Sequence, residues 1–181
     1  MTTPQQLLEF WFDGDPSTHR QVWFEKDADF DQSCTRFADA LCAAKTGALD
    51  EWAITPHGAL ALVILIDQFS RNLFRGSPET YAGDAKARAV ARAAIERGFD
   101  QQVGPIERGF FYLPFEHSEE LTDQADSVRL FTPLGDDAAK WAKHHHDIVQ
   151  RFGRFPHRNT VLGRACTPEE EAWLASEDNT F

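Results

Sequence analysis

Apolar residues recur at helical spacing along most of this chain. Residues 55–69 are apolar nearly all round, which predicts a central buried helix. An alanine-rich stretch over 84–97, followed by Gly98 as its stop, predicts a helix that a neighbouring helix can approach closely. No sustained alternation of apolar and polar residues indicates a strand. One apolar stripe, at i, i+4, i+7 and i+11 of a single predicted helix, consists of Phe30, Cys34, Phe37 and Leu41.

Three threonine–proline pairs mark the starts of helices, because threonine is a favoured N-cap and proline is favoured at the first helical position. The pairs are Thr3-Pro4, Thr55-Pro56 and Thr167-Pro168. Gln6 and Glu170 follow two of these threonines at the spacing of a capping box. Shorter helices are expected around 106–113 and 121–128, and no long linker divides the chain. We therefore predict one all-α domain over residues 1–181, built from antiparallel helical hairpins with short connections.

The composition is typical of a soluble intracellular protein. Among its 181 residues 42% are hydrophobic, with 15 Phe and 5 Trp, which is enough for a large core without a metal or disulfide. The net charge of −11 disfavours binding to nucleic acids and anionic membranes. The three cysteines are scattered, no signal peptide is visible, and the longest apolar run, 59–66, is too short to span a bilayer. We therefore expect a cytoplasmic protein with neither a nucleic-acid nor a membrane partner.

The last third of the chain contains a histidine on an apolar stripe. Of the triple His144-His145-His146, only the middle residue belongs to the stripe, so its ring is predicted to face inward. A buried imidazole needs a partner, because an unpaired buried polar group costs about 1–3 kcal/mol. His145 is therefore either a core residue bonded to a carbonyl or carboxylate, or a functional histidine. The stripe consists of Ala138, Trp141, His145, Ile148 and Phe152.

A basic stretch follows this helix. Residues 148–168 contain no acidic residue, although the chain as a whole is acidic. Arginine suits bidentate recognition of a carboxylate or a phosphate, so the stretch predicts an anion-binding loop. The alternative is that these arginines neutralise acidic residues of neighbouring helices. The arginines of the stretch are Arg151, Arg154, Arg158 and Arg164, and His157 and Asn159 lie among them.

A second polar cluster closes the predicted central helix. Asp67 and Arg71 stand at i, i+4 and are expected to pair on one helix face, with Asn72 beside them. These groups are candidates for ligand binding, and the alternative is that they cap the helix.

A third cluster is His117-Ser118-Glu119-Glu120. Ser118 is predicted to be the N-cap of the next helix, with the two glutamates in its acidic first turn. The functional alternative has His117 facing a pocket, with Glu119 as its orienting group or as a general base.

Sequence motifs do not support a metal or cofactor site. HExxH, paired CxxC, GxSxG, P-loop and GxGxxG motifs are all absent. We therefore predict no metal site and no cofactor, and the motifs leave open whether the protein is an enzyme. The aromatic pairs Trp11-Phe12 and Trp23-Phe24 are interpreted as core packing.

The same residues resemble those of a mainly bacterial family, domain of unknown function 924. The resemblance covers nearly the whole chain and implies stacked helical hairpins of the tetratricopeptide-like class, while implying no reaction. One departure is Ser70, where the family commonly has proline, which affects the stiffness of the second cluster. The resemblance depends on Trp11-Phe12, Trp23-Phe24, Asp67-Gln68-Phe69, Arg71-Asn72, His117-Ser118-Glu119, His145, Phe152 through Asn159, and Leu162-Gly163-Arg164.

Three functional hypotheses follow from these clusters. In the first, a pocket binds a small anionic ligand bearing a phosphate or carboxylate, and His145, His117 and Glu119 transfer protons if there is catalysis. In the second, stacked hairpins form a scaffold for a peptide or partner protein. In the third, the polar groups only stabilise the fold. The residues proposed to bind the anion are Asp67, Arg71, Asn72, Arg154, His157, Arg158 and Asn159.

Overall fold

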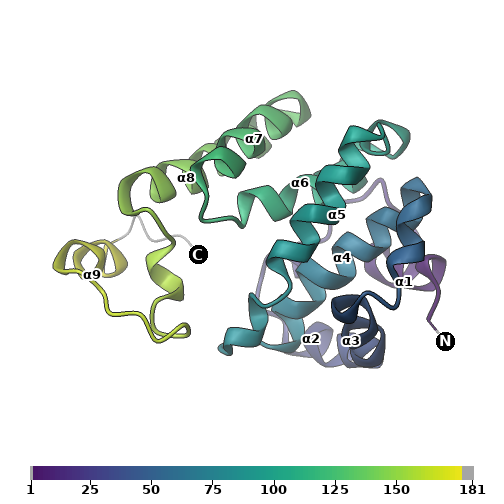
Figure 1. Cartoon of the computed structure of the whole chain (residues 1–181), viewed down its shortest axis with the longest axis horizontal. Helices are drawn as coiled ribbons and strands as arrows, with labels where there is room; N and C mark the ends of the chain where they lie inside the picture. The colour runs from purple at the N-terminus through teal and green to yellow at the C-terminus, as the bar shows by residue number, and fades with distance from the viewer. Residues whose placement is uncertain (1, 177–181) are drawn as a thin grey trace. The chain divides into compact units, whose positions relative to one another are not determined.

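The computed structural model describes residues 2–176 of the chain, and these form two compact units. Within these residues, unit 1 comprises 2–75 and 79–114, and unit 2 comprises 76–78 and 115–176. The described residues contain helices and no β-strand, so the all-helical prediction is confirmed (Figure 1). The expectation of a single domain over 1–181 stays a prediction.

Unit 1 is organised around its longest helix, α4, which α1, α2, α3 and α5 all contact. As predicted, α4 is buried over most of its surface. Its start is set by Thr55, whose hydroxyl accepts the Gly58 amide hydrogen bond, and a Cβ atom at Gly58 would lie 2.0 Å from the Trp52 carbonyl oxygen. Only glycine therefore fits there. The helices are α1 (Pro4–Phe12), α2 (Ala28–Cys34), α3 (Ala38–Thr46), α4 (Pro56–Leu73), α5 (Asp84–Glu96) and α6 (Pro105–Glu116).

Helix α6 belongs to both units. It carries Pro114 in its interior, and the boundary between the units falls directly after this residue. Proline has no amide hydrogen to donate, so the helix lacks one backbone hydrogen bond at this point.

The prediction of one continuous helix through Phe30 and Leu41 is wrong. Helix α2 ends at Cys34, a 3₁₀ turn spans Thr35–Phe37, and α3 begins at Ala38. The tighter turn keeps Phe37 on the buried side, where its ring lies 5.2 Å from that of Phe69. The apolar face therefore survives the break, and all four residues of the stripe are buried.

Unit 2 is built on the adjacent helices α7 and α8, which pack against each other. One hydrophobic cluster of its core consists of Ile148, Val149, Phe155 and Trp173. Gly153, with φ of +70°, ends α8 and allows the chain to turn back towards this core. The helices are α7 (Leu121–Phe131), α8 (Asp136–Phe152) and α9 (Pro168–Leu174).

Two local predictions fail in unit 2. Trp141 was expected on the buried stripe of α8 but is 47% exposed, because the buried side of that helix carries Ala142, Ile148 and Val149 instead. Ser118 is not an N-cap, since α7 begins at Leu121 with Glu120 at the cap position. The Ser118 hydroxyl instead donates to Asp123 and accepts a hydrogen bond from the Glu120 amide. Because α7 begins at Leu121, Glu119 and Glu120 both precede its first turn.

The other helix starts agree with the sequence. Thr3, Thr55 and Thr167 are all N-caps with proline behind them, and Thr3 and Thr167 form capping boxes with Gln6 and Glu170. No helix within residues 2–176 is both long and apolar enough to cross a bilayer.

Candidate functional site

In unit 1, the Asp67–Asn72 cluster fastens α4 to its neighbours. The predicted Asp67–Arg71 pair is present at 3.1 Å, and the Arg71 guanidinium also donates to both carboxylate oxygens of Asp84 at 3.0 and 3.2 Å. Burial alone would lower the pKa of Arg71, but the two aspartates outweigh it and raise that pKa. The Asn72 side chain donates to Asp31 on α2 at 2.7 Å. The cluster therefore holds three helices together.

In unit 2, Arg151, Arg154 and Arg164 of the basic stretch are bound to glutamates. The Arg154 Nε and Nη2 atoms donate to the two oxygens of Glu170 at 2.6 and 2.8 Å, and these hydrogen bonds lower the pKa of Glu170 to about 2. Charge neutralisation within the fold thus accounts for most of this basic stretch. The three pairs are Arg151–Glu169, Arg154–Glu170 and Arg164–Glu119.

The Glu119–Arg164 pair also clamps the backbone of Phe155. One Glu119 oxygen accepts the Phe155 amide at 2.8 Å, and Arg164 donates to the Phe155 carbonyl at 3.1 Å and to both Glu119 oxygens. Burial raises the pKa of Glu119, but the hydrogen bonds from Arg164 and Phe155 outweigh it, so the pKa is lowered. Such a carboxylate is a weak base, and the geometry favours a positioning role for Glu119 over proton transfer.

The ring of Phe155 is the centre of the cluster. The His145 ring lies 5.7 Å from it in an edge-to-face arrangement, and the His157 ring lies 5.6 Å from it. The Arg158 guanidinium lies over the same ring at 4.5 Å and is buried. Because the backbone clamp fixes Phe155, it also fixes the ring that these three polar side chains contact.

His145 is neutral in this environment. Its Nδ1 lies 2.9 Å from the Trp141 carbonyl and 3.5 Å from a Glu116 carboxylate oxygen, and both are acceptors, so Nδ1 carries the proton. Burial lowers the pKa of His145 to about 3, although the hydrogen bond with the Trp141 carbonyl acts in the opposite direction. Burial likewise lowers the pKa of His157 to about 3, and the nearby Arg158 charge acts in the same direction.

His117 and Asn159 belong to the same region of unit 2. A positive charge at His117 would help to lower the pKa of both His145 and His157. Asn159 is buried and accepts from Arg164 Nε at 2.9 Å, and it donates to Cys166 Sγ at 3.3 Å. Of the predicted residues in unit 2, those that contact Phe155 are His145, His157, Arg158 and Glu119. Asp67, Arg71 and Asn72 belong to unit 1.

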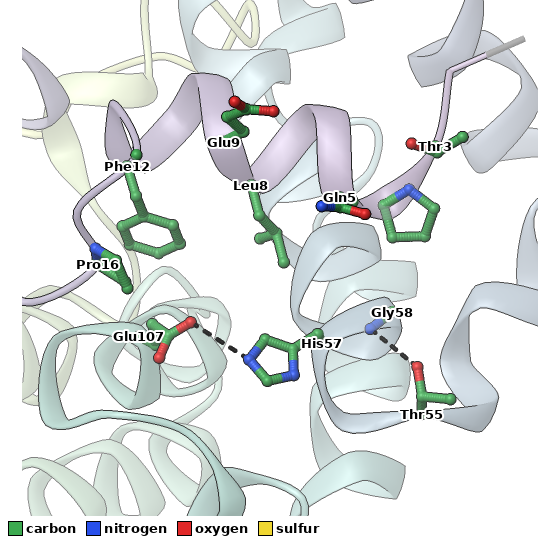
Figure 2. A pocket seen from close by; sticks show the side chains of 12 residues that line it. Thr3, Gln5, Leu8, Glu9, Phe12, Pro16, Thr55, His57, Gly58 and Glu107 are labelled. Atoms are coloured by element: carbon green, nitrogen blue, oxygen red, sulfur yellow. Dashed lines mark hydrogen bonds and ion pairs between the residues drawn. The ribbon is translucent and has the colours of Figure 1, made fainter.

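A groove in unit 1 was missed by the sequence analysis. It has a volume of about 870 Å³ and lies between α1 and the first turns of α4 and α6 (Figure 2). Leu8 and Phe12 point from α1 towards His57 and Glu107, which form an ion pair at 3.8 Å across the opposite wall. The threonine–proline pairs marked these helix starts, but nothing in the sequence indicated that two of them meet at one groove.

Comparison with known proteins identifies the family. The model of a bacterial protein family of unknown function, DUF924, matches residues 7–178. The chain belongs to this family. It is also similar to the solved structure of a protein of unknown function from Agrobacterium tumefaciens, with 46% sequence identity and a TM-score of 0.89 over 95% of this chain and 96% of that one. No curated protein matches this DUF924 chain.

Ser70, where the resemblance led us to expect proline, lies fully buried inside α4 of this DUF924 protein. Its hydroxyl donates to the Ile66 carbonyl at 2.7 Å, one turn earlier. The helix continues to Leu73, so the Asp67–Arg71 pair is formed without a proline at this position.

The two neutral histidines predict a pH dependence of stability. An unfolded histidine has a pKa near 6.5, so between pH 6.5 and about 3 the unfolded chain binds more protons at His145 and His157 than the folded chain does. The contribution of these two histidines to the free energy of unfolding is therefore fully present above pH 6.5. It is lost as the pH falls below that value, by up to about 1.4 kcal/mol per pH unit for each histidine. Urea unfolding from pH 7.5 to 4.5 measures this slope. In His145→Asn the free energy of unfolding should depend less steeply on pH, because one of the two histidines no longer contributes. An unchanged pH dependence would contradict the lowered pKa of His145.

Proposed function

We propose that unit 2 of this DUF924 protein binds a small anionic ligand at Arg158, assisted by the imidazoles of His117, His145 and His157. The observation that carries the proposal is the arrangement around Phe155, where a buried guanidinium and two partly buried imidazoles contact one ring. Arginine provides planar recognition of phosphate or carboxylate, and its interaction with an anion is strengthened where water is excluded.

The surrounding contacts support a preorganised site. The Glu119–Arg164 clamp holds the backbone at Phe155, and Arg154 is held by Glu170 and by the Ala165 carbonyl at 2.9 Å. Groups held in place before binding lose less conformational entropy when the ligand arrives. Arg154 and Glu119 are therefore proposed to support the loop that contains Arg158.

The same geometry favours binding over acid–base catalysis by His145. A group with a pKa of about 3 is a poor base near pH 7, because efficient proton transfer needs a pKa near the working pH. We assign His145 and His157 the role of neutral hydrogen-bonding groups, and we keep His117 as the candidate for proton transfer if a reaction occurs.

The binding site predicts protection by anions. Thermal unfolding is measured with and without phosphate, sulfate and succinate at constant ionic strength. A ligand at 100 times its Kd raises the free energy of unfolding by about 2.7 kcal/mol. We expect at least one of these anions to stabilise the protein and Arg158→Gln to abolish the effect. The matched control is Arg151→Gln, which removes an exposed arginine of the same stretch and should leave protection unchanged.

Two results would contradict the site. In one, none of the three anions protects the wild-type protein. In the other, Arg151→Gln loses protection as fully as Arg158→Gln, which would show that only the general positive charge of the stretch is sensed.

As a second function we propose a tetratricopeptide-like scaffold that binds a peptide or partner protein. The observation in its favour is that four large apolar side chains of the described residues are exposed, namely Phe24, Ile54, Leu121 and Trp141. Such side chains are common at protein interfaces. A pull-down with the wild-type chain and with Trp141→Ala tests this role. Failure to recover a stoichiometric partner with the wild-type chain would count against it.

We also propose that the protein is cytoplasmic. Cys34, Cys42 and Cys166 are free thiols, as is usual for proteins of a reducing compartment.

A further inference from the structure

We propose that the groove in unit 1 binds a small primary amine that carries an apolar body. This site is separate in chemistry and in residues from the anion site proposed in unit 2. Its volume of about 870 Å³ is within the range of pockets that hold small organic ligands.

One wall of the groove suits an apolar group. Leu8 and Phe12 extend from α1 into the space shown in Figure 2, and Pro4 and Pro16 also line it. Phe12 is already buried, so an aromatic or aliphatic body of a ligand would mainly remove Leu8, Pro4 and Pro16 from water, which is favourable in proportion to the apolar area covered.

The charged groups of the groove suit a cation. Of the described residues that line it, Glu9 and Glu107 are acidic, His57 is an imidazole, and none is lysine or arginine. In Figure 2 the Glu9 side chain points away from the groove, whereas Glu107 faces it. Glu107 is therefore the group that fixes the position of a ligand cation.

One carboxylate oxygen of Glu107 accepts a backbone hydrogen bond, and the other faces His57. Its Oε2 accepts the Gly104 amide hydrogen bond at 2.9 Å, whereas its Oε1 lies 3.8 Å from His57 Nε2, which is longer than a hydrogen bond. The Glu107 side chain is only 9% exposed, while that of His57 is 61% exposed and can move aside. An ammonium group at Oε1 would form the short charge-assisted hydrogen bond that the imidazole does not make.

An anion is less suitable, although the first turns of α1, α4 and α6 meet at the groove. Helix starts attract anions through amide hydrogens that lack partners. Here Thr3 accepts the Gln6 amide, Thr55 accepts the Gly58 amide, and Glu107 accepts the Gly104 amide. At each of these helix starts, a side chain of the protein thus already accepts one of the amide hydrogen bonds that an anion would otherwise accept.

The test compares two ligands of similar shape, phenethylamine and the neutral 2-phenylethanol, by titration calorimetry on the full chain. We expect the amine to bind about tenfold more tightly than the alcohol, as one charge-assisted hydrogen bond would provide. Glu107→Gln should bring the two affinities within about twofold of each other, because glutamine retains the acceptor for Gly104 but loses the charge. Glu9→Gln is the matched control and should preserve the tenfold ratio.

A second variant, Leu8→Trp, places an indole ring in the groove and leaves Glu107 in place, so it should weaken the binding of both ligands. The melting temperature of each variant shows whether it is folded. The proposal is overturned if neither ligand binds the wild type, if the alcohol binds as tightly as the amine, if Glu9→Gln loses the ratio as Glu107→Gln does, or if folded Leu8→Trp binds like the wild type. None of these outcomes depends on whether an anion binds unit 2.

Discussion

Replacing Arg71 with alanine is expected to lower the free energy of unfolding by about 3–5 kcal/mol, because breaking a buried ion pair leaves its remaining charges uncompensated. Asp67 and Asp84 are both buried and share the Arg71 guanidinium. Without it, two negative charges remain close together in a region of low dielectric constant. Urea unfolding at pH 7 measures the effect.

The matched control is an exposed ion pair of the same sequence spacing. Lys143 and Asp147 pair at 2.5 Å on the surface of α8, so Lys143→Ala should change stability by less than about 0.5 kcal/mol. Arg71→Lys should recover part of the loss, since it restores the charge without the two parallel hydrogen bonds to Asp84. If Arg71→Ala costs no more than Lys143→Ala, the cluster does not hold the helices of unit 1 together.

Removing the Glu119 side chain is expected to have the second largest effect, a loss of about 2–4 kcal/mol in Glu119→Ala. The change removes the charge partner of Arg164 and the acceptor of the Phe155 amide, which then lies buried without its hydrogen bond. Amide hydrogen exchange at Phe155 provides a local readout, because exchange should become faster in the variant. Anion protection should decrease as well, since the clamp holds the loop that contains Arg158.

Two controls separate the clamp from a general charge effect. Glu119→Gln keeps an acceptor for the Phe155 amide and should lose less stability than Glu119→Ala. Glu169→Gln removes a carboxylate from the exposed pair with Arg151 and should change stability by less than about 0.5 kcal/mol. Equal losses in Glu119→Ala and Glu169→Gln, with unchanged exchange at Phe155, would show that Glu119 does not position this loop.

Local patterns in the sequence predicted most helices correctly. The burial of α4 follows from its uninterrupted apolar residues, and the starts at Thr3, Thr55 and Thr167 follow from capping chemistry within four residues. The Asp67–Arg71 pair was predictable for the same reason, because i, i+4 residues face each other on one turn of helix.

Predictions failed where a distant segment decided the outcome. The helix through Phe37 is broken because a tighter turn seats that ring against Phe69, which is far away in sequence. Trp141 is exposed although the spacing placed it on the apolar stripe, because its neighbour Ala142 lies on the buried side of α8 in its place. Ser118 bonds to Asp123 and so does not cap α7.

The sequence by itself determined the helical class, the three helix starts at threonine–proline pairs, the family and the residue types available for an anion site. Only the tertiary structure decided which of these groups form ion pairs with each other, because Glu119 and Arg164 are separated by 45 residues in the sequence and Arg71 and Asp84 by 13. It also decided that His145 is neutral and that Leu8 and Glu107 line one groove. The physical reason is that helix formation depends on neighbours within a few residues, whereas burial and charge pairing depend on segments that only folding brings together.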